Sequence, residues 1–256
     1  MTAVFDSHCH IDDPRFDADR PEVLARAEAA GIDHLVVPGV SASTWHRTRR
    51  VCAHDARLHA TFGLHPYFIA QHAREDLDTL RDWVRTEHPV AIGECGLDYH
   101  IRELDQRRQR AFFEAQLDLA VEAGLPVILH ARRAVDDVIG ALQARPGLRA
   151  DVHSFAGSEV QARRLIDLGA MLGIGASVQF ERANRLRRIV SDVPLANLLV
   201  ETDAPDQPGP DRRGGRNEPV FVTEVIATIA GLRGLDYDEV AVQTRLNALE
   251  LFAIHD

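Results

Sequence analysis

The sequence contains no lysine, because all 29 of its Lys and Arg residues are arginine. This absence excludes every mechanism that needs a lysine amine, including Schiff-base and pyridoxal-phosphate chemistry and the phosphate-binding lysine of P-loop NTPases. It also excludes a metal centre bridged by a carbamylated lysine. A formal net charge of −10 argues against a general nucleic-acid coat, since such a protein presents a basic face to the phosphates.

Long apolar runs and paired cysteines are also lacking. No uninterrupted stretch of about 18 apolar residues occurs, so we expect no membrane span. The cysteines Cys9, Cys52 and Cys95 are widely separated and form no CxxC pair, which indicates a reducing compartment. The first ten residues, MTAVFDSHCH, hold a polar cluster and leave no room for an apolar signal region. We therefore expect a soluble cytoplasmic protein, with no exposed apolar stripe that demands a protein partner.

The chain does contain a regular succession of short apolar runs, separated by segments of helical periodicity. The runs recur at roughly 25 to 35 residues and are continuous, which is typical of a parallel sheet covered on both faces. Eight such units in about 250 residues predict a (β/α)8 TIM barrel, with a doubly wound open sheet as the alternative. No linker or repeat marks a boundary, so a single domain over 1–256 is expected. The predicted strands lie near 3–7, 34–40, 58–64, 89–93, 126–130, 149–154, 170–176 and 196–202.

Two predicted helices have clear end signals. One begins after Asp19, with Pro21 in its first turn, and stops at Gly31. The other ends at Gly124, and its polar positions are expected to face solvent. Its expected apolar face consists of Phe113, Leu117, Ala120 and Val121. A Pro/Gly-rich stretch, 204–219, is expected to form a long loop before two further helices, near 220–232 and 237–252.

Side chains suited to metal binding stand at the ends of the predicted strands. His8 and His10 follow the first strand two residues apart, so both point to the same side. Glu94 ends the fourth strand and His130 the fifth. Closing the sheet into a barrel brings the carboxyl ends of all its strands around one mouth, where barrel enzymes keep their active sites. The full set of candidate ligands is His8, His10, Glu94, His130, His153 and Asp203.

Four imidazoles and two carboxylates at one mouth indicate a metal site. Mixed nitrogen and oxygen donors suit zinc, manganese, magnesium, cobalt or iron, and six ligands exceed the need of one tetrahedral ion. We therefore expect two divalent metal ions that share a bridging carboxylate and activate a water for hydrolysis. Because lysine is absent, that bridge must be a carboxylate, and Glu94 is placed to supply it. The other histidines considered, His34, His46, His54, His59, His72, His88 and His100, are expected to be ordinary core or loop residues.

Several segments resemble the TatD family of metal-dependent hydrolases. FDSHCHID at 5–12, PVILHARRAVDD at 126–137 and the stretch 194–205, which ends in LLVETDAP, are similar to its three signature segments. GLHP, GECGLDY, HSFAGS and NEP match its pattern in the same order along the chain. The resemblance implies a barrel with a divalent-metal centre and phosphodiesterase activity, usually described as deoxyribonuclease with 3′-to-5′ exonuclease character.

The resemblance also implies residue roles. One metal would be held by His8, His10, Glu94 and Asp203, and the second by Glu94, His130 and His153. Asp203 would orient or deprotonate the attacking water, which makes Asp203 and Glu94 the catalytic residues. The chain departs from the commonest pattern at Ser154, Ala156 and Asp206, and in this it resembles the branch with ETDAPD. Asp206 leaves the identity of the substrate undecided, because it adds negative charge near the expected phosphate.

Further residues are candidates for substrate binding. His65 and Arg132 are expected to contact a substrate phosphate, since a guanidinium fork suits a phosphate. Arg133 is expected to point away, and Asp98 either orients a metal ligand or is a turn residue. The 204–219 loop, which contains Arg212, Arg213 and Arg216, is expected to be mobile and solvated, with folding over a polyanion as the alternative.

The sequence thus predicts a hydrolase of phosphodiester bonds that acts at DNA ends or on another phosphodiester. Short or single-stranded ends are favoured, because the remaining acidic surface should repel long nucleic acid. Two alternatives stay open. The same ligands could polarise a small carbonyl substrate, as in an amidase, lactonase or deaminase, or the barrel could bind metal without catalysis.

Overall fold

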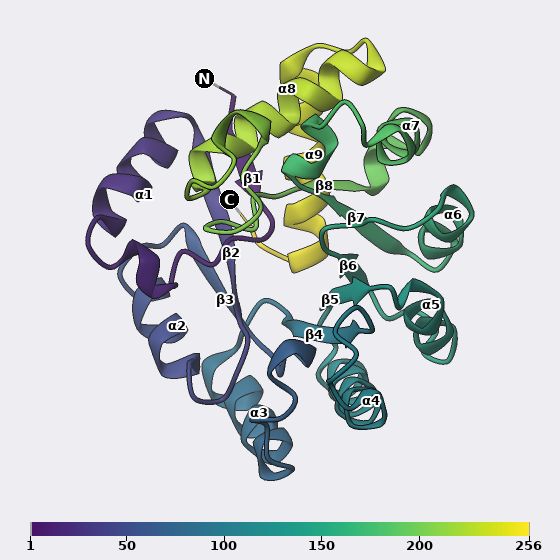
Figure 1. Cartoon of the computed structure of the whole chain (residues 1–256). Coiled ribbons are helices and arrows are strands. Elements are labelled where there is room, and N and C mark those ends of the chain that lie inside the picture. Colours follow the sequence, from purple (N-terminus) through teal and green to yellow (C-terminus); the bar gives the residue numbers. More distant parts are fainter. Residues whose placement is uncertain (1, 256) are drawn as a thin grey trace.

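The computed structural model describes residues 2–255 and contains one sheet of eight parallel strands, ordered β1 to β8 as in the chain. The strands lie at the centre with the helices around them (Figure 1). Backbone hydrogen bonds join the two ends of the sheet, from Ser7 N to Val200 O (3.0 Å) and from Asp203 N to His8 O (2.8 Å). The predicted (β/α)8 barrel is therefore confirmed.

Seven of the eight predicted strands agree with the structure to within two residues at each end. The described strands are β1 (Val4–Asp6), β2 (Ile32–Gly39), β3 (Leu58–Phe62), β4 (Ile92–Asp98), β5 (Val127–Arg132), β6 (Ala150–Val152), β7 (Ala170–Ile174) and β8 (Leu198–Val200). The described α-helices are α1 (Arg20–Ala29), α2 (Trp45–Cys52), α3 (Glu75–Glu87), α4 (Gln106–Ala123), α5 (Val135–Gln143), α6 (Glu159–Asp167), α7 (Asn184–Asp192), α8 (Val222–Arg233) and α9 (Tyr237–Phe252).

The fourth strand is the one whose prediction was wrong. It was expected at 89–93, with Glu94 at its end, but β4 runs to residue 98 and Glu94 lies inside it. An apolar run cannot mark this strand, because two glycines and a glutamate interrupt it. The strand persists because it pairs with β5. That pairing requires glycine at position 96, since a Cβ on Gly96 would lie 2.0 Å from the carbonyl oxygen of His130.

The helices end where their local signals predict, but one side chain lies on a different helix face from the one expected. Helix α1 begins directly after Asp19, as predicted, and α4 ends at Gly124, which adopts a positive φ of 67°. Phe113, Leu117 and Ala120 are buried, but Val121 is 55 % exposed, so its predicted place on the apolar face was wrong. One residue turns an α-helix by about 100°, which carries Val121 out of contact with the sheet.

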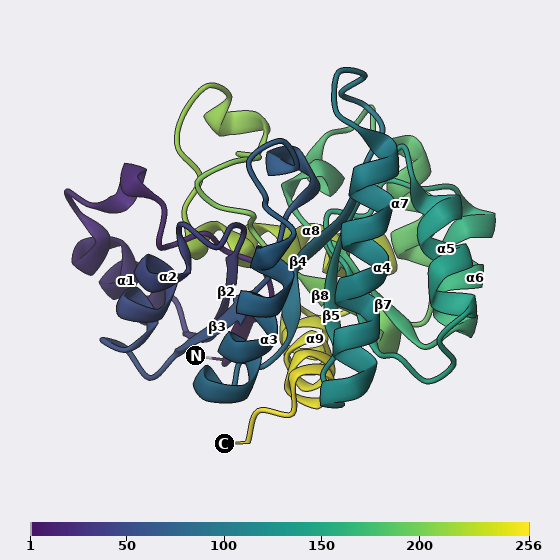
Figure 2. The same ribbon diagram turned by 90° about the horizontal axis from the view of Figure 1, so that it is seen from below.

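The lower half of the barrel is closed by apolar side chains. Phe5, Ile128 and Leu199 from β1, β5 and β8 form one buried cluster with Leu251 and Phe252 of α9. Helix α9 lies beneath the sheet in the side view, and long loops project at the opposite end (Figure 2). The closed end has no room for a ligand, so the polar residues that follow the strands gather at the open mouth.

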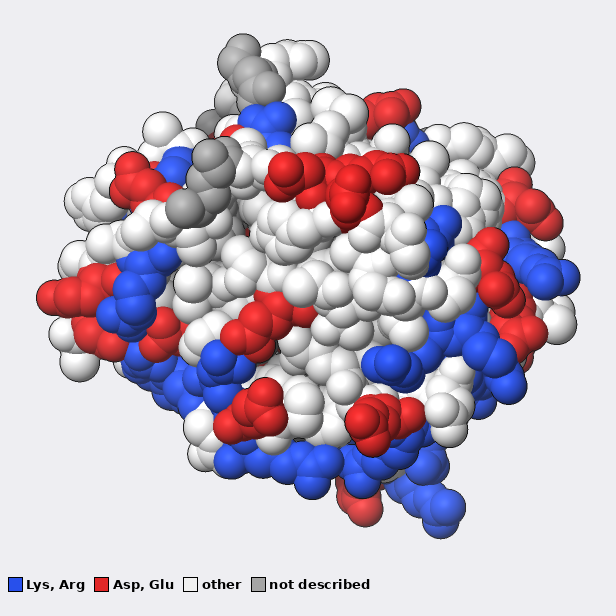
Figure 3. All heavy atoms as spheres, turned by 90° about the horizontal axis from the view of Figure 1, so that it is seen from above, with Lys and Arg blue, Asp and Glu red and all other residues white. Residues whose placement is uncertain are grey.

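The charged surface is mixed. On the face drawn in Figure 3, arginines lie next to aspartates and glutamates, and no single continuous basic surface covers it. Within residues 2–255 no helix combines the length and apolar character needed to cross a bilayer.

Candidate metal centre

One group of predicted ligands surrounds the nitrogens of His8 and His10. The Nε2 atoms of His8 and His10 are 3.3 Å apart. Oε2 of Glu94 lies 3.4 Å and 3.6 Å from these two nitrogens. Oδ1 of Asp203 lies 3.6 Å and 3.5 Å from them. Donors about 2.1 Å from one tetrahedral ion would be about 3.4 Å from one another, so the donors of His8, His10 and Glu94 have the spacing for a single ion. Asp203 lies within reach of both histidines.

A second group surrounds the other oxygen of Glu94. Oε1 lies 2.9 Å from Nε2 of His65, 3.2 Å from Nδ1 of His130 and 3.3 Å from Nε2 of His153. Glu94 therefore offers one oxygen to each of two donor groups, which is the arrangement expected of a bridging carboxylate. His65, predicted only as a phosphate contact, lies in the second group.

Electrostatics at this cluster favour a bound cation. Burial lowers the pKa of His8 to about 4, and His153 adds to the effect, so the imidazole stays in the neutral form that binds metals. Burial alone would raise the pKa of Glu94, but the imidazoles of His65, His153 and His8 hold it well below its usual range. Burial would lower the pKa of His10, yet Glu94 and Asp203 raise it to about 9. The carboxylates of Glu94 and Asp203 thus stabilise positive charge at the position that a divalent ion would occupy.

Asp98, at the end of β4, supports one of these histidines. Its Oδ2 lies 3.2 Å from Nε2 of His130, on the ring edge opposite Glu94. Its Oδ1 accepts a hydrogen bond from the backbone N–H of His100 (2.8 Å), which fixes the carboxylate. Of the two roles considered for Asp98, the contact favours orientation of His130. Arg132 lies beside this pair, with Nη1 3.8 Å from Oδ2 of Asp98.

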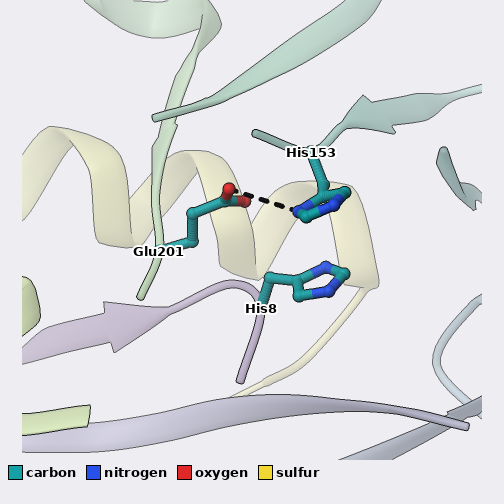
Figure 4. A group of neighbouring side chains, drawn as sticks. All are labelled: His8, His153 and Glu201. Atoms are coloured by element: carbon teal, nitrogen blue, oxygen red, sulfur yellow. Dashed lines mark ion pairs between the residues drawn. The ribbon is translucent and has the colours of Figure 1, made fainter. Parts of the chain in front are cut away.

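Two buried acids below the cluster were missed by the sequence analysis. Glu201 has an Oε1 that lies 3.3 Å from Nδ1 of His153 and accepts a hydrogen bond from the Ser154 N–H (2.7 Å). Figure 4 shows Glu201 facing His153, whose ring stacks on that of His8 at 3.9 Å. Asp151 is also fully buried, and neither of its carboxylate oxygens has a hydrogen-bond partner. Both acids lie two residues before a predicted ligand, on the same side of the chain, and that spacing was the available signal.

Asp203 is held by a short chain of hydrogen bonds. Its Oδ2 accepts a hydrogen bond of 2.6 Å from the side-chain amide of Gln207. The amide oxygen of Gln207 in turn accepts one of 3.0 Å from the hydroxyl of Ser154. Gln207 was not identified from the sequence, because its partners come from separate loops. These hydrogen bonds hold the carboxylate with its Oδ1 directed at His8 and His10.

The cluster opens into a cavity of about 1380 Å³, lined in part by the predicted substrate residues His65 and Arg132. Arg133, which was expected to point away, is also among the residues that line the cavity. Asp206 is paired at the rim with Arg15, which binds both of its oxygens at 2.9 Å and 2.7 Å. Arg15 also binds both oxygens of Asp13.

The arginines of the 204–219 loop are engaged rather than free in solvent. Arg212 makes a bidentate pair with Glu224 and lies over the ring of Phe221. Arg216 pairs with Asp19 at 2.8 Å and 2.6 Å. These pairs attach two of the three arginines to their surroundings, so the expectation that they are solvated was wrong for Arg212 and Arg216, whereas Arg213 is exposed.

An eight-stranded parallel barrel whose mouth gathers imidazoles and carboxylates defines the class of metal-dependent barrel hydrolases. The chain belongs to the TatD family: the family model described as TatD related DNase matches residues 5–253. An Escherichia coli K12 protein named uncharacterized metal-dependent hydrolase YjjV is 36% identical, with 97% of each chain covered. The crystal structure of that TatD homolog superposes with a TM-score of 0.94 at 35% identity, covering 98% of each chain. The 3'-5' ssDNA/RNA exonuclease TatD of Erwinia amylovora is 37% identical, with 98% of this chain and 100% of that one covered.

Proposed function

We propose that this member of the family is a divalent-metal-dependent phosphodiesterase that removes nucleotides from the 3′ ends of single-stranded DNA or RNA. The observation that carries the proposal is the geometry of Glu94, whose two oxygens face two separate donor groups at the base of a large cavity. Two-metal sites of this kind suit in-line displacement at phosphorus. The name of the Erwinia amylovora relative supports the choice of substrate.

The donor groups suggest how two ions would be held. His8, His10, Glu94 and Asp203 would hold the first, because an oxygen of each carboxylate lies 3.4 to 3.6 Å from the Nε2 atoms of both histidines. Glu94, His130 and His153 would hold the second. When bound, such ions lower the pKa of a water molecule and offset the charge on the phosphoryl oxygens.

Side chains of the protein transfer the proton and bind the phosphate. Asp203 accepts the proton of the attacking water at its carboxylate, which the amide of Gln207 keeps oriented. His65 and Arg132 contact phosphoryl oxygens of the substrate, since both line the cavity beside the cluster. Glu94 acts as the bridge between the two donor groups. Water is the nucleophile, and the reaction passes through no covalent intermediate with the protein.

The cavity favours a nucleic-acid end over a small carbonyl substrate. Pockets for small ligands measure about 300 to 1,000 Å³, and this cavity has a volume of about 1380 Å³. A lactone or amide would leave much of it unfilled, whereas a nucleotide and its neighbour would occupy more. Since every predicted ligand lies at the mouth, nothing favours a barrel that binds metal without catalysis.

A direct comparison of substrates tests the proposal. The manganese- and magnesium-loaded protein is incubated with a labelled single strand and, separately, with a panel of lactones and amides. We expect stepwise shortening of the strand from its 3′ end. Hydrolysis of the panel alone would show that the site acts on carbonyl compounds and would overturn the proposal.

A further inference from the structure

Tyr67 is an exposed aromatic side chain on the wall of the cavity. It is 55 % exposed, whereas many of the chain's other aromatics, such as Phe62 and Phe113, are almost completely buried. The other large hydrophobic side chains exposed among the described residues, Val121, Val160, Val242 and Leu246, do not line the cavity. An exposed aromatic that borders an active-site cavity is a candidate binding surface.

The backbone of Tyr67 is fixed relative to the candidate metal centre. Pro66 restricts the chain at the start of a short 3-10 helix, and Nδ1 of His65 accepts a hydrogen bond of 3.0 Å from the Tyr67 N–H. His65 in turn lies 2.9 Å from Glu94. The ring of Phe68 packs edge-on to that of Tyr67, with centroids 5.0 Å apart. Two residues of chain span at most about 7 Å, so the Cα of Tyr67 lies within that distance of the Cα of His65, whose ring reaches the donor cluster.

The charges that line the cavity indicate which side chains are available to the phosphates of a ligand. Asp13 and Asp206 are both paired with Arg15, and Asp137 is paired with Arg110. Arg133 has no ion-pair partner within residues 2–255, and Arg132 has only its long contact with Asp98. The wall that carries these two arginines therefore suits phosphates. The rings of Tyr67 and Phe68 also line the cavity, and an aromatic ring suits a flat, uncharged group.

We propose that Tyr67 is a stacking platform for the nucleobase at the 3′ end of a single strand, positioned while the adjacent phosphodiester lies at the Glu94 cluster. This inference rests on the proposed function and names the part of the substrate that the cavity recognises. Stacking on an aromatic ring accepts every base, so the subsite selects an unpaired terminal nucleotide without selecting sequence. A base inside a duplex is stacked on both faces and cannot use the platform, so the subsite takes a terminal base.

The test compares two strands that differ only in the terminal base. One ends in an ordinary 3′ nucleotide, and the other ends in an abasic tetrahydrofuran nucleotide. The measured quantity is the ratio of kcat/KM for the first strand to kcat/KM for the second. Base stacking on an aromatic is worth enough that Tyr67→Ala should lower this ratio by about 5- to 150-fold. Tyr67→Phe keeps the ring and should preserve the ratio.

Leu246→Ala is the matched control, because it removes an exposed hydrophobic side chain away from the cavity, and it should leave the ratio unchanged. Equal losses on both strands in Tyr67→Ala, or no loss on either, would overturn the stacking role while leaving the phosphodiesterase intact. If the wild-type protein cleaves neither strand with manganese or magnesium, the proposed function fails, and the subsite fails with it.

Discussion

Replacing Glu201 by glutamine should change the stability of the metal-free protein and its metal affinity in opposite directions. In the wild type, Oε1 of Glu201 contacts His153 and the Ser154 N–H, while Oε2 is buried without a partner. Glutamine retains an oxygen for the first two contacts. Its amide nitrogen would replace the unpartnered oxygen, Oε2. This oxygen lies near Asp151, because both acids border Gly173: a Cβ built on Gly173 would lie 2.4 Å from Oε2 of Glu201 and 3.0 Å from Oδ1 of Asp151.

The magnitudes follow from these contacts. A buried polar atom without a partner costs about 1–3 kcal/mol, so we expect the metal-free variant to gain up to that amount in free energy of unfolding. Loss of the negative charge behind His153 weakens this imidazole as a ligand. Outer carboxylates of this kind are typically worth about 10- to 100-fold in metal affinity, or about 1.4 to 2.7 kcal/mol.

Two assays on chelator-treated protein measure the two effects. Urea unfolding gives the stability of the metal-free form, and calorimetric titration with Mn²⁺ gives the affinity. Glu224→Gln is the control: it breaks an exposed pair with Arg212, so it should change stability by less than about 1 kcal/mol and leave metal affinity unchanged. Metal affinity equal to wild type in Glu201→Gln, or a lower stability of its metal-free form, would refute the reasoning.

Three further predictions concern the rim, the catalytic carboxylate and the closed end of the barrel. Arg15→Ala leaves Asp13 and Asp206 unpaired at the mouth and should raise KM for a single strand about 3- to 10-fold, with the effect fading at high salt. Asp206→Asn should not raise KM, and a rise would contradict this reading. Gln207→Leu removes the hydrogen bond to Oδ2 of Asp203 and should lower kcat about 10-fold with KM nearly constant; an unchanged kcat would rule out the orienting role. Burial, reinforced by His34, lowers the pKa of His59 to about 4. Between about pH 6.5 and pH 4, His59 is therefore protonated in the unfolded chain but neutral in the folded chain. The free energy of unfolding falls as the pH is lowered through this range. His59→Gln should reduce the loss of urea midpoint between pH 7 and pH 5, and an identical loss would show that other groups cause it.

Much of the barrel could be predicted because its signals are local. Asp19 and Gly124 mark helix ends through their own backbone preferences, and apolar runs mark seven strands. The fourth strand could not be located this way. Its extent depends on pairing with β5 across glycines and a charged residue, which is a property of the assembled sheet.

The centre of the candidate site was predictable for a different reason. A parallel barrel brings all strand ends to one mouth, so His8 and Asp203 meet despite their separation in the chain. Contacts made by loops were not predictable. The pairing of Arg15 with Asp206 joins two loops 191 positions apart, and no periodicity specifies where such side chains meet. Glu201 could have been found, because it lies two residues before a predicted ligand and faces the same side.

The account's central claim is that two ions shared by Glu94 support phosphodiester cleavage. The most direct test adds Mn²⁺ stepwise to chelator-treated protein and follows shortening of a labelled single strand. We predict no cleavage without metal and a rate that levels off at two equivalents of Mn²⁺ per chain, with no cleavage by a folded Asp203→Asn variant at any amount of metal. Full activity at one equivalent, or cleavage by Asp203→Asn at the wild-type rate, would contradict the claim.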